Sequence, residues 1–258
     1  MQYKFSTSNR MYISVAQGFR APVLDDMSRT GKKKGGFKVA NPDLNPELIT
    51  SYETGIDLRF LKNLLFNGSV FYSIGRDFMY YTSTGDSVNM GYKLAPILKM
   101  QNIGKVEIKG VELELKYEFK ENLITFVNYT YTQAQIIEHN ITDARVDSSL
   151  TGKFLTDIPN HKFSSGITLR NKFANTSLLF KYYGQTWIND WNTVDTEYFK
   201  TDKFPEYYTF NIRIEKELFS KFSISLSIEN ILNKIYVDGN LEQCPGRFAT
   251  GSVRYKFD

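Results

Sequence analysis

The chain is poor in the residues that build disulfides, metal centres and membrane helices. It has one cysteine, Cys244, and two histidines among 258 residues. A lone cysteine cannot form an internal disulfide, which excludes a disulfide-stapled secreted fold. No run of about 18 apolar residues exists that could form a transmembrane helix. His139, in a long loop, has no cysteine or histidine at metal-ligand spacing, so we expect no metal site.

The signs of an enzyme or a nucleic-acid-binding protein are also missing. The formal net charge is +4, and the basic residues are scattered except at residues 32–34. We interpret that run as a solvated loop tip, with binding of an anionic ligand or a surface lipid as the alternative. Glu112, Glu114 and Glu118 lie on one face of an expected strand, where they line a wall rather than flank a reacting bond. We therefore expect no catalytic residues, no cofactor and no nucleic-acid partner.

Aromatic residues and two-residue alternation are what the sequence has in quantity. The chain contains 20 Phe and 17 Tyr, which fits strands that carry rings at both water–lipid boundaries. Residues 111–119 (VELELKYEF) and 222–229 (FSISLSIE) alternate between apolar and polar side chains. Period two over this length predicts strands with one apolar face.

Connections between the expected strands alternate between short and long. Tight polar links lie at residues 61–63, 120–122, 171–175 and 220–221, and long stretches at about 17–50, 82–100, 133–160, 188–204 and 232–246. Short turns at one end and long loops at the other predict an all-β, antiparallel up-and-down transmembrane β-barrel segment of about ten strands. The strands are expected at about residues 11–18, 51–61, 64–74, 107–119, 123–132, 162–170, 176–187, 207–219, 222–230 and 247–257.

Alternation alone does not decide which face meets lipid, because a sandwich or a soluble barrel also alternates. Several strands exceed the usual five or six residues of soluble sheets, at about the length that crosses a bilayer at a tilt. We therefore expect apolar side chains toward lipid and charged ones toward an aqueous lumen. A complete ten-stranded barrel (a passive pore or a hydrolase) and a soluble β-sandwich binding module remain alternatives. The first residues lack an apolar h-region, so a membrane protein would need an export signal upstream.

Short motifs recur in a fixed order along almost the whole chain. The first two are GFRAP, with Phe19, Arg20, Ala21 and Pro22, and NPDLNPE, with Asn41, Pro42 and Leu44. They are followed by YETG at 52–55, an NxGxxxxxGxE pattern at 102–112, NYTYT at 128–132, IPNHK at 158–162 and IENILN at 228–233. In this combination the chain resembles the C-terminal part of the β-barrel of a TonB-dependent outer-membrane receptor.

The resemblance implies a fold, a location and a set of partners. Such receptors resemble one another in being barrels of about 22 strands filled by an N-terminal plug domain. Residues 1–258 would be the C-terminal barrel portion, with the plug and the TonB box outside this chain. An iron–siderophore or similar scarce nutrient would be taken up across the Gram-negative outer membrane. The implied partners are that ligand, outer-membrane lipid, the TonB complex through the N-terminal part, and the barrel-insertion machinery.

Two departures from the family pattern qualify these expectations. Residues 23–40 contain no histidine, which argues against haem ligation from that loop. Tyr255 and Phe257 would form the membrane-insertion signal, but Asp258 follows them.

Recognition of the ligand is expected from aromatic and arginine side chains on the loops, which offer large contact areas and directional donors. The candidates are Arg20, Tyr80, Tyr81, Trp187, Trp191 and Tyr198. Girdling of the membrane interface is the alternative for many of the aromatics, particularly Trp187. His161 is interpreted as part of a structural turn. Because ten strands are too few for the implied barrel, we expect an open, curved sheet whose free edges are residues 11–18 and 247–257.

Overall fold

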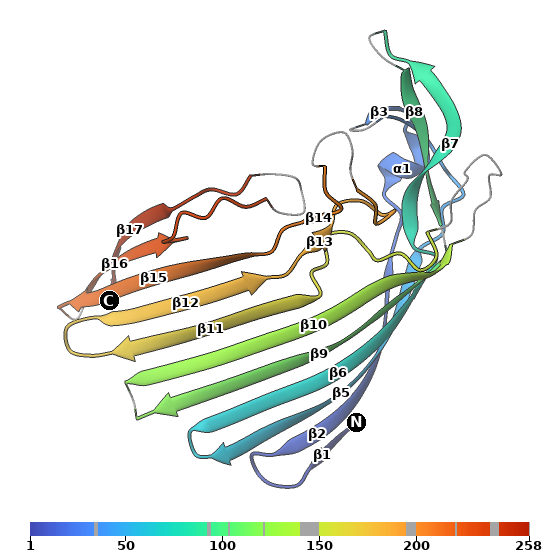
Figure 1. Cartoon of the computed structure of the whole chain (residues 1–258). Helices are drawn as coiled ribbons and strands as arrows, with labels where there is room; N and C mark the ends of the chain where they lie inside the picture. Colours follow the sequence, from blue (N-terminus) through green and yellow to red (C-terminus); the bar gives the residue numbers. More distant parts are fainter. Residues whose placement is uncertain are drawn as a thin grey trace.

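Eleven strands pair side by side in one curved antiparallel sheet, and their order in the sheet follows the chain (Figure 1). The computed structural model describes residues 1–33, 36–91, 94–102, 104–120, 122–139, 150–194, 200–219, 221–237 and 243–257. The sheet consists of β1 (Gln2–Lys4), β2 (Arg10–Arg20), β5 (Glu47–Leu61), β6 (Leu64–Arg76), β9 (Gly104–Phe119), β10 (Leu123–His139), β11 (His161–Arg170), β12 (Asn175–Tyr183), β15 (Tyr207–Leu218), β16 (Phe222–Glu229) and β17 (Phe248–Tyr255). Among the described residues, no helix is both long and apolar enough to cross a bilayer.

The predicted strands are confirmed, with changes at their ends. All ten expected segments contain a strand of the main sheet, and β1 is an eleventh that was not expected. The segment expected at residues 176–187 leaves the main sheet after Tyr183, and its last two residues form the short β13 (Thr186–Trp187), paired with β14 (Lys203–Phe204). His139 is the last residue of β10 rather than part of a loop, because β10 extends beyond the predicted end.

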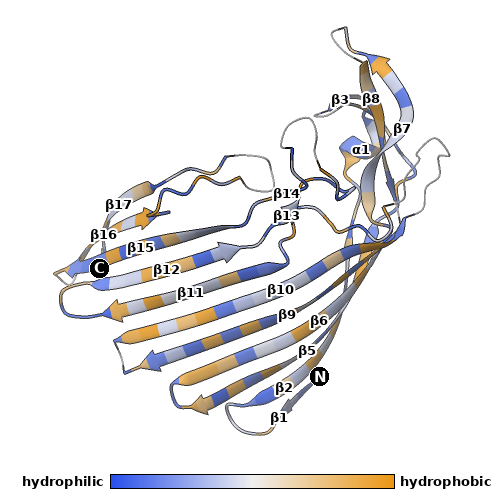
Figure 2. Cartoon of the chain, in the orientation of Figure 1, coloured by the Kyte–Doolittle hydropathy of each residue, from blue (hydrophilic) through white to orange (hydrophobic). Residues whose placement is uncertain are grey.

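The convex face of the sheet is apolar and exposed. Cross-strand register places Val127, Leu115, Phe66 and Leu58 in one row across four strands. Leu113 and Leu226 on this face are 39% and 47% exposed, and no second sheet of the described residues covers them. A β-sandwich would bury these side chains between layers. The expected orientation, with apolar side chains outward, is therefore confirmed, and the sandwich alternative is wrong. Hydrophobic and hydrophilic residues alternate along the strands of the sheet (Figure 2).

The height of the apolar face matches a membrane. On β9 it extends from Val111 to Phe119, eight residue steps in the strand. At about 3.3 Å per residue and a tilt of about 40°, this corresponds to a band roughly 20 Å tall. An outer-membrane barrel carries an apolar band of about 25 Å. The apolar face is therefore tall enough to span most of the hydrocarbon layer.

The two ends of the sheet differ, and we call them the turn end and the loop end. At the turn end, two-residue to four-residue links join β5 to β6, β9 to β10, β11 to β12 and β15 to β16. The link from β9 to β10 is tight enough to put Lys120 at φ +54°, a left-handed conformation that suits short turns. The five-residue link from β1 to β2 also lies at the turn end, and the long connections emerge at the opposite end, as the sequence predicts (Figure 1).

The segments at residues 17–50 and 82–100 were expected to be long loops. This expectation is wrong, because parts of both segments fold into a second sheet. This loop sheet has the order β3 (Gly31–Lys33), β4 (Gly36–Val39), β8 (Leu94–Asn102) and β7 (Met79–Asn89), and the short helix α1 (Leu24–Ser28) lies beside it (Figure 1). The central pair, β4 and β8, is parallel and joins residues about 60 positions apart in the chain. Local alternation carries no signal for such a distant pairing.

The main sheet is open rather than closed. Its outermost strands are β1 and β17, which do not pair with each other among the described residues. The expected free edge at residues 11–18 is partly wrong, because β1 pairs with β2 from Arg10 to Tyr12 and so covers the start of that edge. The other expected edge is confirmed at β17, although this strand ends at Tyr255. A sealed ten-stranded cylinder is therefore not the structure of this chain.

Candidate ligand-contact site at the loop end

An ion pair between the exposed Arg20 and the buried Glu47 joins the first two sequence motifs at the base of the loop end. The Arg20 guanidinium donates two hydrogen bonds to Glu47, of 2.6 Å from Nε and 2.5 Å from Nη2. The same carboxylate, almost fully buried, also accepts a bond of 2.8 Å from the backbone N–H of Met79. Arg20 was predicted to recognise ligand. Its Nε and Nη2 are already bonded to Glu47, and only the remaining exposed N–H groups of the guanidinium are available to an anion.

The loop sheet is held by a buried lysine between two aspartates. Lys38 is 2% exposed, and its Nζ donates to the carboxylates of Asp25 and Asp26, at 2.8 Å in the case of Asp26. The Tyr81 hydroxyl also donates to Asp26, and the Lys33 Nζ lies 2.9 Å from the centre of the Tyr81 ring. Four segments, α1, β3, β4 and β7, therefore meet at one charge cluster.

The protonation of this cluster is set by its partners. Burial alone would raise the pKa of Asp26, but hydrogen bonds from Lys38 and Tyr81 hold that pKa below its ordinary value. Burial alone would lower the pKa of Lys38, but hydrogen bonds to Asp25 and Asp26 raise it. Both groups therefore stay charged over the physiological range. Tyr81, predicted as a recognition residue, has a hydroxyl that is already engaged.

Tyr80 lies against the small apolar core on the concave side of β9 and β10. That core consists of Val106, Ala134, Ile136, Leu150 and Leu155. Burial raises the pKa of the Tyr80 hydroxyl well above its usual value, and the nearby carboxylates of Asp190 and Glu47 raise it further. Burial also raises the pKa of Asp190, to which the Thr156 hydroxyl donates at 3.3 Å. Tyr80 therefore packs strand β7 of the loop sheet onto the concave side of β9 and β10.

The two tryptophans belong to the loops rather than to the membrane girdle. The Trp187 ring is stacked on Phe154 with an interplanar angle of 5°, and the Lys203 Nζ lies 4.2 Å from its centre. Trp187 lies in β13, outside the main sheet that carries the apolar band. Trp191 is 39% exposed. It precedes Asn192, whose side chain bonds to both the N–H and the C=O of Phe154. Tyr198 lies outside the described residues.

Most other residues of the sequence motifs hold turns or pack side chains rather than point into an open site. Buried Asn41 donates to the Met100 carbonyl at 2.8 Å and accepts a bond from the N–H of Asp43, which fixes the turn around Pro42. Leu44 is buried close by. Phe19 is exposed on the convex face, followed by Ala21 and Pro22 where β2 ends. Tyr255 and Phe257 contact each other edge to face at 4.7 Å at the turn end.

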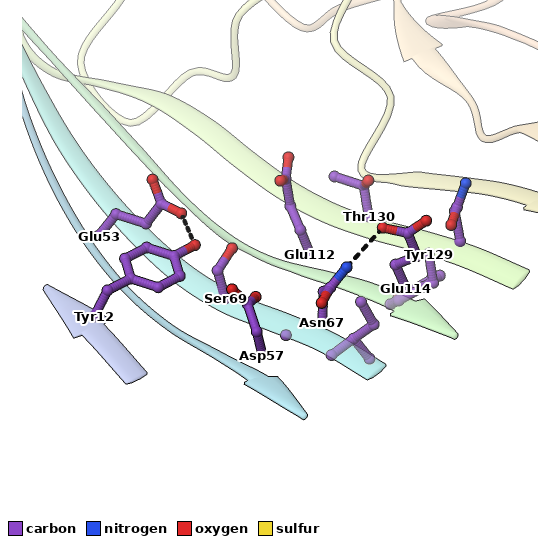
Figure 3. Close-up of a pocket in the computed structure, with 12 residues that line it drawn as sticks. Tyr12, Glu53, Asp57, Asn67, Ser69, Glu112, Glu114, Tyr129 and Thr130 are labelled. Atoms are coloured by element: carbon purple, nitrogen blue, oxygen red, sulfur yellow. Dashed lines mark hydrogen bonds between the residues drawn. The ribbon is translucent and has the colours of Figure 1, made fainter. Parts of the chain in front are cut away.

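The concave face below the loops is polar. Tyr12, Glu53, Asp57, Asn67, Ser69, Glu112, Glu114, Asn128 and Thr130 line a depression of about 360 Å³ (Figure 3). The Tyr12 hydroxyl donates to Glu53 at 2.6 Å, and Asn67 donates to Glu114 at 3.0 Å. Glu112 and Glu114 do line one wall, as predicted, and Glu112 has no ion-pair partner among the described residues.

Glycines on this wall lie under aromatic rings of neighbouring strands. A Cβ on Gly55 would lie 2.5 Å from the Tyr12 ring, and a Cβ on Gly166 would lie 2.4 Å from the Phe126 ring. The rings therefore lie flat along the wall only because these positions lack a side chain.

Neither histidine faces the lumen as an open ligand. His161 lies on the convex face at the start of β11, where its Nδ1 is 2.8 Å from the Tyr129 hydroxyl and its ring is 5.3 Å from that of Tyr131. The prediction that His161 is part of a structural turn is wrong, because it is the first residue of β11 and pairs with Tyr131 of β10. The Nδ1 of His139 accepts the N–H of Leu150 at 3.0 Å, and burial lowers the pKa of its ring. The described residues contain no group of side chains able to hold a metal ion.

Comparison with known proteins identifies the family. The profile of the family described as TonB dependent receptor-like, beta-barrel, matches residues 1–231. The chain belongs to this family. An uncharacterized TonB-dependent receptor of Haemophilus influenzae is 25% identical over 238 residues, which cover 91% of this chain and 61% of that protein. The TonB-dependent heme receptor A of Haemophilus ducreyi is 25% identical over 192 residues, 69% of this chain and 25% of that receptor.

Solved structures agree on the fold of this TonB-dependent receptor barrel. The ferric enterobactin receptor of Pseudomonas aeruginosa superposes with a TM-score of 0.74 at 17% identity, over 98% of this chain and 39% of that one. The chain thus spans about three fifths of the first relative and well under half of the solved receptor. The family is one of Gram-negative outer-membrane transport receptors, so the barrel segment lies in the outer membrane and is not an enzyme. The short turns then face the periplasm and the loop end faces outward.

Sequence reasoning missed Lys38, Asp26 and Glu47. Lys38 is one of many scattered lysines, and its burial depends on α1 and β8, which were not predicted. Glu47 could have been found. It ends the NPDLNPE motif while Arg20 lies in the GFRAP motif, and the two are direct partners in the β2–β5 register.

Proposed function

We propose that this chain is the C-terminal barrel part of an active-transport receptor that takes up an iron–siderophore or a similarly scarce nutrient, energised through TonB. The observation that carries the proposal is a polar concave wall beneath a folded loop sheet, at whose side exposed aromatic and cationic groups gather. A passive pore needs no folded loop sheet outside its barrel. A receptor that first captures its ligand outside and then passes it inward needs such a binding surface.

The ligand class is narrowed by what the loop end offers. Trp191 presents an exposed ring, and Lys33 and Lys203 present cations over aromatic rings, while exposed Arg20 is already paired with Glu47. These groups suit a bulky ligand with anionic or aromatic parts. Histidine ligation of haem has less support, because His161 faces outward and His139 is bound to the backbone of Leu150. We therefore favour a ferric siderophore.

The acidic part of the concave wall is proposed to meet a plug domain. Glu53, Asp57, Glu112 and Glu114 come from neighbouring strands. Arg10 offsets the charge of Asp57, whereas Glu53 and Glu114 accept hydrogen bonds from the neutral side chains of Tyr12 and Asn67. A plug with basic side chains on its surface would complete these bonds inside the lumen.

Uptake by the intact gene product tests the proposal. A strain deleted for the gene would be given iron-55 as a panel of ferric siderophores, with and without a protonophore. We expect the wild-type gene to restore uptake of at least one of them, and the protonophore to abolish it. Trp191→Ala should weaken binding several-fold, while Trp187→Phe, which keeps the stack on Phe154, should not. Uptake that continues after the proton gradient collapses would refute energised transport.

A further inference from the structure

A cationic depression lies on the concave wall beside the acidic one. It measures about 290 Å³, and its lining includes Asn128, Thr130, Lys162, Ser164, Lys181 and Tyr183. None of its lining residues, all of which the structure describes, carries a carboxylate. It shares Asn128 and Thr130 with the acidic depression of Figure 3. Two surfaces of opposite charge therefore adjoin on one wall.

The cationic depression lies just inside the loop end. Lys162 is the second residue of β11, and Lys181 comes two residues before the end of β12. Directly above them, the Gly184 N–H donates to the His161 carbonyl at 2.8 Å, and the chain continues into β13 with Trp187. A molecule that moves from the Trp187 segment into the lumen therefore passes this part of the wall.

The two lysines face the lumen without a counter-ion. Lys162 pairs with Tyr183 and Lys181 pairs with Ser164, so the lysines occupy diagonal positions on one face of the sheet. Diagonal neighbours lie about 7–8 Å apart, which is within the Debye length at physiological ionic strength. Neither lysine forms a salt bridge within the described part of the chain. Their charges therefore repel each other, and an oxyanion between them would offset that repulsion.

The nearest carboxylates in the register do not neutralise this pair. Glu112, Thr130 and Lys162 stand in one row across β9, β10 and β11. Two strand spacings of about 4.8 Å separate the backbones of Glu112 and Lys162. Glu229 lines a separate depression that also contains Lys181. Among the described residues, neither glutamate is bonded to either lysine, so the depression keeps its positive charge.

Neutral donors complete the lining. The Ser164 hydroxyl oxygen accepts a hydrogen bond of 3.5 Å from Asn128 Nδ2, which leaves the Ser164 hydroxyl hydrogen available as a donor. Thr130 adds a second hydroxyl. Two ammonium groups and two hydroxyls can together bind one carboxylate or a similar oxyanion. An uncharged ligand would lack the charge-assisted part of these bonds.

We propose that Lys162 and Lys181 form an oxyanion subsite that contacts the anionic part of the transported ligand as it enters the lumen. The pair thereby selects anionic iron chelates over uncharged ones. Because β12 carries Lys181 and leads directly into β13, the subsite follows the loop segment that presents Trp191. The assignment to a transported ligand rests on the proposed function, whereas the affinity of the lysine pair for an oxyanion does not.

Uptake by the full-length gene product tests the selectivity. Iron-55 would be given to the deletion strain as anionic chelates with carboxylate or catecholate oxygens, and as uncharged trihydroxamate chelates. A partly exposed lysine contributes up to about fivefold in affinity for an anion. Lys162→Gln with Lys181→Gln should therefore raise the half-saturating concentration of an anionic chelate roughly tenfold, and should leave uptake of any uncharged chelate unchanged.

Matched variants separate the subsite from general charge effects. Lys162→Arg with Lys181→Arg keeps both charges and should keep wild-type uptake. Lys116→Gln with Lys172→Gln removes the same charge near the turn end and should also leave uptake unchanged. Heat-modifiability on gels shows that each variant is folded.

Iron-free citrate is a probe of the subsite that does not depend on transport. Purified full-length protein with carbon-13-methylated lysines would be titrated with citrate and followed by NMR. The resonances of Lys162 and Lys181, assigned from single Lys→Arg variants, should shift together and saturate, while that of Lys116 should not move.

The two measurements distinguish the subsite from the transport function. Saturable citrate binding without uptake of any ferric chelate would support the subsite and refute the transport function. Uptake confined to uncharged chelates would overturn the subsite while transport stands. An equal loss of anionic and uncharged chelates in Lys162→Gln with Lys181→Gln would do the same, because it would mean that the lysines only support the wall. The subsite is also overturned if citrate shifts neither lysine.

Discussion

Replacing Lys38 by methionine should release the loop sheet without unfolding the barrel. The substitution keeps the volume of the side chain and removes the charge that satisfies Asp26, whose side chain is 11% exposed. Leaving one member of a buried ion pair unpaired costs about 3–5 kcal/mol. Asp25 is 48% exposed, so water reaches one side of the cluster, and we lower the expected cost to about 2 kcal/mol.

A cost of about 2 kcal/mol increases the population of the open loop sheet about 30-fold. Hydrogen exchange of the full-length gene product, followed peptide by peptide, measures that population. Exchange across β4 and β8 should accelerate about 30-fold, while β6 and β9 should stay protected. Lys32→Met, on the neighbouring strand but exposed, is the matched control and should change exchange little. Equal exchange in the two variants would show that the Lys38 cluster does not stabilise the loop sheet.

Two further outcomes follow from the orientation of the sheet and the charges of the cluster. Leu113→Arg, on the lipid face, should destabilise the barrel by about 2–4 kcal/mol in urea titrations of the reconstituted protein. Glu114→Arg, one residue along and facing the lumen, should be tolerated. If Glu114→Arg were the more destabilising of the two, the assigned membrane orientation would be wrong. Because the folded pKa of Asp26 is lowered and that of Lys38 is raised, protection of β4 should be full between about pH 4 and pH 10. Protection should fall as the pH drops through the lowered pKa of Asp26, and again as the pH rises through the raised pKa of Lys38. Asp26→Asn should remove the loss of protection at acidic pH and keep the loss at alkaline pH.

The main sheet could be predicted from the sequence because lipid imposes one demand on all of its strands. Residues such as Leu113, Leu115 and Ile224 face hydrocarbon throughout, so the period of two persists along each strand. Turn positions followed from the polar links between these runs. β1 was missed because three residues are too few to show a period.

The loop end could not be predicted in the same way. The pairing of β4 with β8 depends on a tertiary approach of two loops, and neither strand alternates clearly on its own. Recognition residues were selected for being aromatic or basic, and the structure shows that two of them, Arg20 and Tyr81, are bonded to Glu47 and Asp26. Whether Trp191 and the others contact ligand stays a prediction.

The parallel pairing of β4 with β8 has a mechanical consequence. The connection from β2 to β5 and the connection from β6 to β9 share one sheet, so neither can swing alone. At the neck of this sheet, Asn102 donates to the carbonyls of Asn45 and Asp77 and accepts the N–H of Asn45. Any widening of the entrance on this side must therefore be a rotation of both connections as a single rigid flap about that neck.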